Sequence, residues 1–213
     1  MGGRGAPGPL PMSFTDPSDS FRGDTVAVLD FETTGVSVSA GDRATELAIV
    51  LVRAGRIVDR FQSLMHTGVP IPWHIQRLTG ITDEMTASAP PAAQVMRDAA
   101  AFVGDAPMVA HNAGFDRRFW GHECGLAGLP DQGRFACTLL LSRRLYLDAP
   151  SHKLGSLAEH LGLPRSGPAH RALADTEMAA HLWLRMVADL QERHGCAAPD
   201  HDRMVQLQGT PAG

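Results

Sequence analysis

Two carboxylates close the apolar run VAVLDFETTG at residues 26–35, where Asp30 and Glu32 stand two positions apart. The apolar entry and the Thr-Thr-Gly exit are typical of a short buried strand that ends in a turn. Because side chains alternate between the two faces of a strand, both carboxylates point to the same side. Like charges this close raise each other's pKa and cost stability unless something offsets them. The natural offset is a hard cation with oxygen ligands, so the run predicts a metal site.

Two further motifs supply the other side chains that such a site needs. In HNAGFD, Asn112 is expected to cap a helix after the strand PMVAH, which puts Asp116 just over one turn into that helix. In HRALADT, His170 and Asp175 are five residues apart, or about 140° around an ideal helix, so they do not share a helix face. Both can serve one site only if His170 lies on the loop before the helix. The Pro and Gly residues within 164–168 favour such a loop.

Four carboxylates and one imidazole around a single cleft indicate phosphodiester hydrolysis. The carboxylates carry a charge of about −4, which two divalent cations, Mg²⁺ or Mn²⁺, would neutralise. Two ions roughly 3.5–4 Å apart can bridge a phosphodiester, generate hydroxide from water and stabilise the leaving oxygen. A histidine with a pKa near neutrality is suited to take the proton from that water.

The motifs DFETTG, HNAGFD and HRALADT, in this order, resemble the three motifs of the DEDD 3′–5′ exonuclease superfamily. The five-residue step from His170 to Asp175 resembles its DEDDh branch. Two intervening segments, IQRLTGITDE and SHKLGSLAEHLGLP, are similar to segments of the same family, and the resemblance spans about residues 24–188. Within the family the chain looks most similar to the epsilon, or proofreading, subunit of bacterial DNA polymerase III.

The resemblance implies a role for each of the five residues. Asp30 would contact both metal ions, and Glu32 and Asp175 would complete the shell of the ion that holds the attacking water. Asp116 would serve the second ion through water, and His170 would be the general base. Six more residues would lie near the terminal nucleotide, the last two as an apolar wedge or stacking surface: Phe31, Thr33, Thr34, Gly35, Leu78 and Ile81.

Three functions are compatible with these residues. The first is a metal-dependent exonuclease that trims single-stranded DNA from its 3′ end and releases nucleoside monophosphates. The second is trimming of RNA, because no residue is assigned to read the 2′-hydroxyl. The third is a non-catalytic module that docks a polymerase, against which the five intact acidic and His positions speak. The segment MVQLQGTPAG does not match the polymerase-binding segment or clamp motif of epsilon, so a free-standing nuclease fits as well as a polymerase or clamp partner.

The elements that position these residues form an α/β domain. Apolar runs at 44–53 and 56–66, separated by the turn signal Ala54-Gly55, predict two strands antiparallel to the first. Alternating helices and short strands follow, which predicts a mixed sheet, and by the resemblance a ribonuclease H-like one. The long helix over 171–194 ends at Gly195. Residues 1–22 are expected to be a disordered Gly/Pro-rich tail, 23–195 the exonuclease domain and 196–213 a loose tail.

The composition excludes several classes. A net charge of −4 and a pI of about 6.2 leave no basic footprint of the kind that wraps duplex nucleic acid. Three widely spaced cysteines predict reduced thiols rather than zinc, and no signal peptide or membrane span is seen, so a cytoplasmic protein without membrane contact is expected. The three tryptophans are interpreted as core residues, and Glu46 as structural. Lys153, the single lysine, lies near the predicted cleft and could contact the backbone of the substrate.

Overall fold

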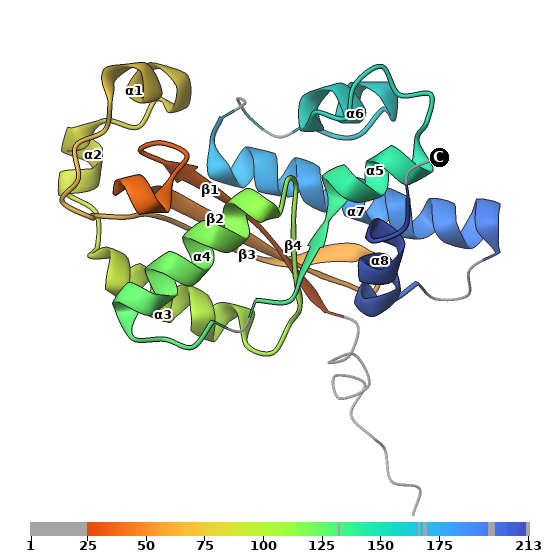
Figure 1. Cartoon of the computed structure of the whole chain (residues 1–213), viewed down its shortest axis with the longest axis horizontal. Coiled ribbons are helices and arrows are strands. Elements are labelled where there is room, and N and C mark those ends of the chain that lie inside the picture. Colours follow the sequence, from red (N-terminus) through yellow and green to blue (C-terminus); the bar gives the residue numbers. More distant parts are fainter. Residues whose placement is uncertain (1–24, 132, 166, 168–169, 196–198, 212–213) are drawn as a thin grey trace, which may run out of the picture.

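The computed structural model describes residues 25–131, 133–165, 167, 170–195 and 199–211. Its centre is one five-stranded sheet in the order β3-β2-β1-β4-β5 (Figure 1). The strands are β1 (Val26–Thr33), β2 (Ala44–Arg53), β3 (Arg56–Leu64), β4 (Met108–Ala110) and β5 (Phe135–Cys137). The first three are antiparallel, whereas β4 runs parallel to β1 and β5 parallel to β4. The predicted mixed sheet is therefore confirmed.

The turn between β2 and β3 has the predicted form. Ala54 and Gly55 both have positive φ, 49° and 76°. Two such residues in succession match the right-handed twist of the flanking strands, which is why a hairpin closes here. β1 is the central strand: it pairs with β2 over its whole length and with β4 at Ala27 and Val28. Its carboxyl end, beyond Val28, is paired with β2.

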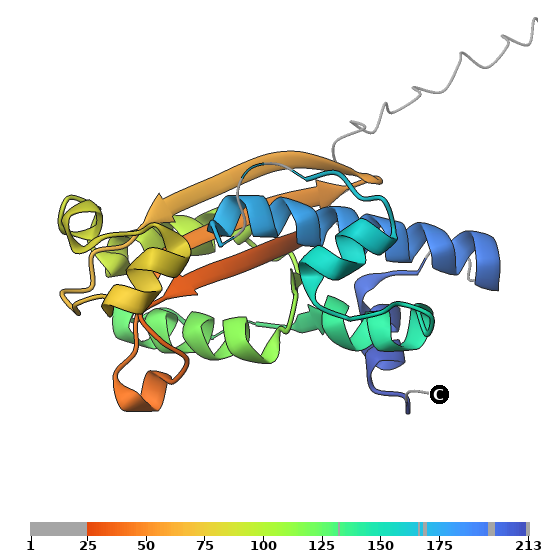
Figure 2. The same cartoon turned by 90° about the horizontal axis from the view of Figure 1, so that it is seen from above.

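Helices cover both faces of the sheet. Their bounds are α1 (Trp73–Thr79), α2 (Asp83–Ala87), α3 (Ala92–Val103), α4 (Gly114–Ala127), α5 (Thr138–Leu145), α6 (Leu154–His160), α7 (Ala172–His194) and α8 (His201–Gln208), with a 3₁₀ turn at Val38–Ala40. Odd-numbered residues of β1 pack with α3 and α4, and even-numbered ones pack with α7. Figure 2 shows α7 lying along the sheet. Alternation along β1 therefore turns Asp30 and Glu32 toward the α7 side.

The start of α4 differs from the prediction. Asn112 is not the helix cap: it has a φ of 66°, and Ala113 occupies the cap position without a side-chain hydrogen bond. Instead, the Asn112 carbonyl accepts a hydrogen bond from the Phe115 amide at 2.8 Å. The turn from β4 into α4 needs a left-handed residue, which asparagine tolerates better than most.

The C-terminal segment is also not the loose tail that was expected. Asp200 caps α8 by accepting from the Arg203 amide at 2.8 Å, and the Met204 side chain is fully buried. The Gln208 side chain accepts from the Cys137 amide at 2.6 Å, so it pairs with the backbone of β5. The sequence signal was weak because α8 has few apolar residues. The predicted N-terminal tail, residues 1–22, lies outside the described residues.

Within the described part of the chain, no helix combines the length and apolar character needed to cross a membrane.

The burial of Met204 gives a stability test of α8. Met204→Ala should lower the free energy of unfolding by about 2–5 kcal/mol, because it removes a fully buried side chain between α8 and the sheet. Chemical denaturation followed by circular dichroism would measure the loss. The exposed Gln206 on the same helix is the control, and Gln206→Ala should change stability by less than about 0.5 kcal/mol. Equal, small effects of both substitutions would show that α8 is not docked.

Candidate active site

Asp30 and Glu32 lie at the carboxyl end of β1, where the sheet opens toward α7. Both side chains are half-buried, and their neighbours on the strand, Leu29, Phe31 and Thr33, are buried. Across the ladder, Asp30 faces Ala48 and Glu32 faces Glu46, and the register then shifts at a bulge after Glu32. A bulge at a strand end re-aims the residues beside it. Asp30 and Glu32 therefore lie on one face of β1, near its carboxyl end, and the shared face is as the sequence predicted.

Asp116 reaches the same place from α4. Its side chain is 1% exposed, and its Oδ1 accepts a hydrogen bond from the Phe31 amide, which lies between the two β1 carboxylates, at 3.2 Å. This bond ties the first turn of α4 to β1 across 85 residues of sequence. The helix thus delivers a third carboxylate to the end of the central strand.

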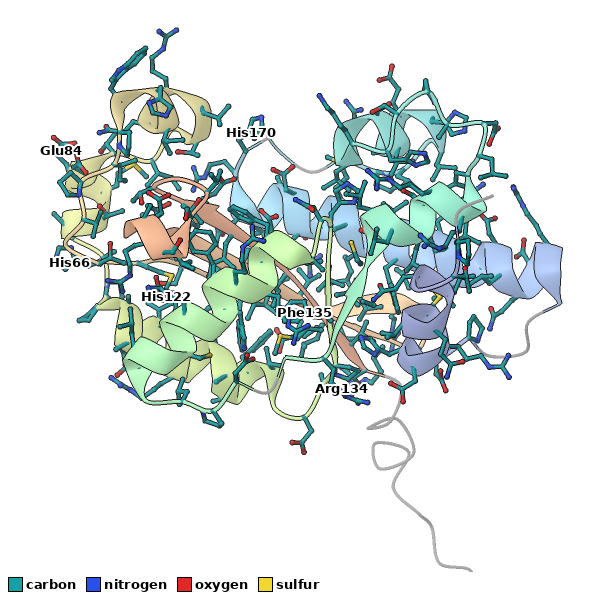
Figure 3. The ribbon with its side chains drawn as sticks, viewed as in Figure 1. His66, Glu84, His122, Arg134, Phe135 and His170 are labelled. Carbon is teal, nitrogen blue, oxygen red and sulfur yellow. The ribbon has the colours of Figure 1, made fainter. Side chains whose placement is uncertain are left out.

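The fourth carboxylate and the histidine come from the start of α7. His170 precedes the helix on a loop, as the five-residue spacing required, and has a φ of 60°. Its amide donates to Asp175 Oδ2 at 2.9 Å. Glu32, His170 and Asp175 each offer a ligand atom within 4.8 Å of the others. Figure 3 shows His170 on this loop, at the end of the molecule that also carries α1.

An ion pair between the half-buried Arg171 and the buried Glu46 holds the start of α7 in place. Glu46 is 1% exposed and accepts from the Arg171 guanidinium at 3.0 and 3.3 Å, and from the Ala172 amide at 3.1 Å. Gln62 donates to the same carboxylate at 2.8 Å. With these partners satisfied, Glu46 serves as an anchor for the segment that carries His170, which agrees with its interpretation as a structural residue.

The cluster is electrostatically strained. Burial, and then the neighbouring Asp116 and Glu32, raise the pKa of Asp30 well above its ordinary value. Burial and the charge of Asp175 raise the pKa of Glu32 to about 7, against a smaller lowering by Arg171. Burial also raises the pKa of Asp116 to about 7, although the Phe31 amide opposes it. The pKa of Asp175 is likewise raised by burial.

This donor set fits divalent cations. Four carboxylates whose pKa values are raised lack enough positive charge around them, and their oxygens are the ligands that hard ions such as Mg²⁺ and Mn²⁺ prefer. A bound cation would offset both the burial and the mutual repulsion of these groups.

A hollow of about 260 Å³ opens beside the carboxylates. Its polar lining includes the carboxylates of Asp30, Glu32 and Asp175 and the imidazole of His170. Most of the other lining residues are apolar. Of the six predicted substrate contacts, four line it: Phe31, Thr33, Gly35 and Leu78. Leu78 is 53% exposed, so its side chain is free to meet a base.

Two predicted contacts, Thr34 and Ile81, do not line the hollow. Ile81 is fully buried and cannot present a surface to a nucleotide. Thr34 is 2% exposed; its hydroxyl accepts from the Arg43 amide at 3.0 Å and so closes the loop that carries the 3₁₀ turn. Both residues face the protein interior because the turn after β1 and the end of α1 fold back on themselves. The two sequence neighbours of Thr34, Thr33 and Gly35, line the hollow instead.

Other residues of the hollow were not foreseen from the sequence. Val36, Ile75, Thr79 and Phe115 also line it. Ile75 and Leu78 are three apart on α1, so helical spacing could have paired them. Trp73 is 69% exposed rather than buried, with Arg77 stacked over its ring at 5.7 Å, whereas Trp120 and Trp183 are core residues as predicted.

Comparison with known proteins shows where this geometry recurs. The model of the family described as Exonuclease (RNase_T) matches residues 27–183. The PolC-type DNA polymerase III of Bacillus cereus is 35% identical over 185 residues, which are 86% of this chain and 13% of that protein. The PolC-type polymerase of Bacillus subtilis is 35% identical over 202 residues, 94% of this chain and 14% of that protein. The chain thus spans about one seventh of the length of these relatives.

Solved structures agree. Exonuclease X in complex with 5′ overhanging duplex DNA superimposes with a TM-score of 0.68 and 28% identity, covering 86% of this chain and 99% of that one. The nuclease domain of 3′hExo, a DEDDh family member bound to rAMP, gives 0.67 and 22%, covering 79% and 94%. At that identity the second likeness concerns the fold alone. The expected ribonuclease H-like fold is confirmed.

The raised pKa of Asp116 predicts a pH-dependent stability without metal. The unfolded carboxyl loses its proton near pH 4 and the folded one near 7, so in EDTA the wild type should lose stability as pH rises between these values. Asp116→Asn removes this penalty, and should raise the free energy of unfolding by about 2–4 kcal/mol at pH 8 and hardly at all at pH 4.5. Chemical denaturation at both pH values would measure the difference.

The exposed Asp105→Asn is the control and should be neutral at both pH values. Mg²⁺ should stabilise the wild type at pH 8 more than Asp116→Asn, because ligand binding to the folded state raises its stability by mass action. A variant that is no more stable than the wild type at pH 8 would contradict the electrostatic strain described above.

Proposed function

Because this chain belongs to the Exonuclease (RNase_T) family, as a DEDDh-type member related to the proofreading exonucleases of DNA polymerase III, we propose that it hydrolyses phosphodiester bonds from the 3′ end of single-stranded DNA. The products would be nucleoside monophosphates. The observation that carries the proposal is the meeting of four carboxylates and His170 at the end of β1, beside a hollow with apolar walls. We place the nuclease domain at residues 23–195, with α8 packed against it.

The four carboxylates would hold the divalent metal ions that the family uses. We assign two ions, Mg²⁺ or Mn²⁺, to Asp30, Glu32, Asp116 and Asp175, because two such ions balance four carboxylates. When bound, the ions would place positive charge on the scissile phosphate and lower the pKa of a nearby water. The raised pKa values of these carboxylates support the assignment, since each group would gain from a neighbouring cation.

His170 would act as the general base. It lies on an exposed loop within reach of Glu32 and Asp175, and it lines the hollow. The hydrogen bond from the His170 amide to Asp175 and the Glu46–Arg171 ion pair fix the backbone around His170. The imidazole ring lines the hollow, where it would turn toward a water molecule. An imidazole can take the proton of that water and release it to solvent.

The apolar part of the hollow would hold the terminal nucleotide. Leu78, Val36 and Phe115 offer faces on which a base can stack without regard to its identity. We favour DNA over RNA, because the PolC-type relatives are DNA polymerases and Exonuclease X was solved with DNA. RNA is the alternative substrate, since rAMP is bound to 3′hExo. The intact cluster disfavours a module that only docks a polymerase.

A gel assay tests the activity and the sugar preference together. Two 5′-labelled single strands, one with DNA at the 3′ end followed inward by RNA and one of the opposite order, would be incubated with Mg²⁺, Mn²⁺ or EDTA. We expect a metal-dependent ladder from the 3′ end that stalls where RNA begins. Asp30→Asn, which keeps the shape of the side chain, should abolish the ladder. Full activity of Asp30→Asn would contradict the metal assignment, and no digestion by the wild type would contradict the proposed activity.

His170→Gln separates proton transfer from metal binding. The substitution should lower kcat by about 10²–10⁴, because it removes general-base catalysis, and should leave the Mn²⁺ affinity within about threefold of wild type. Isothermal titration with Mn²⁺ would measure the affinity. His74→Gln, at an exposed position on α1, is the control and should keep the wild-type rate. If His170→Gln instead lost Mn²⁺ binding, His170 would be a metal ligand rather than the base.

A further inference from the structure

A second hollow region lies beside the carboxylate site, between α4, α5 and the segment that leads into α6. Two hollows of about 450 and 390 Å³ share three lining residues, Asn112, Leu139 and Arg143. Arg117 lines one of them and Lys153 the other. We call the two together the basic groove.

Among the described residues, the Asp, Glu, Lys and Arg side chains that line the basic groove are all cations. Arg117, Arg143 and Lys153 contribute three positive charges, and among the described residues no aspartate or glutamate lines either hollow. This is unusual for a chain that carries 23 acidic and 19 basic residues. A concentration of one sign of charge in a concave surface attracts a ligand of the opposite sign.

These three side chains are also free. In the described part of the chain, no hydrogen bond or ion pair engages the side chain of Arg117, Arg143 or Lys153. Other arginines are bound to carboxylates: Arg43 to Glu123 at 2.8 Å, Arg171 to Glu46 at 3.0 Å and Arg185 to Asp189 at 3.0 Å. The groove therefore keeps its charges available for an external anion.

The basic groove and the carboxylate site lie at the same end of the sheet, where β1 and β4 finish. β4 runs parallel to β1, so its carboxyl end, followed by Asn112, lies at the same edge as Asp30 and Glu32. Along α4, Arg117 follows Asp116 directly, with the first exposed and the second buried. Figure 1 shows α1 and α6 at this end of the molecule, on opposite sides of the start of α7. A chain that ends at the carboxylates can continue over the groove.

We propose that the basic groove binds the phosphodiester backbone of the substrate strand upstream of the 3′-terminal nucleotide. The inference rests on the proposed function and adds where the rest of the strand lies. Arginine and lysine contact phosphates without reading sequence, which suits an enzyme that must advance along any strand. The carboxylate site is negative and does not itself attract a negatively charged strand, whereas the groove is positive. The strand is drawn to the cations of the groove, and only its 3′ end reaches the carboxylates.

Charge removal tests the groove. Arg143→Gln combined with Lys153→Gln would be compared with Arg56→Gln combined with Arg97→Gln, which removes the same charge from exposed positions elsewhere. Arg56 lies at the β2–β3 turn, at the opposite end of β1 from the carboxylates. The substrates are a 5′-labelled 12-nucleotide DNA strand, which can cover the groove, and a 5′-labelled dinucleotide, which cannot.

The groove variant should raise KM for the 12-nucleotide strand by about tenfold or more, with kcat/KM for the dinucleotide within twofold of wild type. Fluorescence anisotropy of the strand in EDTA should show the salt dependence of binding, log K against log salt, becoming shallower by about 1.4, that is, about 0.7 for each lost phosphate contact. The control variant should match the wild type in both. Equal values for groove and control variants, or an equal loss on the two substrates, would overturn the proposal.

The single lysine allows a direct footprint. An amine-reactive acetylating reagent should modify Lys153 in the free protein, and an excess of the 12-nucleotide strand in EDTA should protect it at least fivefold, with peptide mass spectrometry separating Lys153 from the chain's α-amine. Unchanged modification with the strand bound would overturn the proposal. The anisotropy and the footprint need no turnover, so a wild type that binds but does not digest would sink the proposed function and leave the groove to be judged by these two measurements.

Discussion

The mutual repulsion of four carboxylates at the end of β1 is the constraint on which the rest of the site depends. Burial raises the pKa of each of them, and neighbouring carboxylates raise it further for Asp30, Glu32 and Asp116. The folded chain therefore holds these groups at a cost that the unfolded chain does not have. The stability of the sheet offsets this cost: its central strand, β1, has a neighbouring strand on each side, and apolar side chains pack on both of its faces. A cation that relieves the repulsion would therefore bind to a scaffold that is already in position.

Two of the four carboxylates, Asp116 and Asp175, accept hydrogen bonds from backbone amides, and an ion pair outside the cluster holds the start of α7. The Phe31 amide fixes Asp116, the His170 amide fixes Asp175, and the Glu46–Arg171 pair fixes the segment between strand and helix. These contacts join residues that are 85, 5 and 125 positions apart. The site is assembled from three distant segments, and precise placement comes from rigid elements rather than from a local motif.

Period and motif were enough to predict much of this arrangement. Alternation along β1 put Asp30 and Glu32 on one face, and the 140° argument put His170 on a loop, both of which the structure has. What failed depends on contacts that local patterns do not contain. Ile81 is buried because the chain turns at Gly80. Asn112 adopts a left-handed conformation in the turn that follows β4. The docking of α8 depends on a hydrogen bond between the Gln208 side chain and the backbone of β5. Trp73 shows the converse error, an aromatic residue that the fold leaves outside.

The hydrogen bond from the Cys137 backbone amide to the Gln208 side chain has a consequence beyond the docking of α8. A three-residue strand at the border of a sheet offers its free amides to any other extended chain, and α8 occupies that place from within the same molecule. The opposite border, β3, is long, but it presents the exposed Asp59 and Arg60, and charged side chains discourage edge-to-edge pairing. α8 thus covers one border of the sheet, and charged side chains disfavour strand addition at the other, so we expect a concentrated solution of this protein to resist growth into β-aggregates.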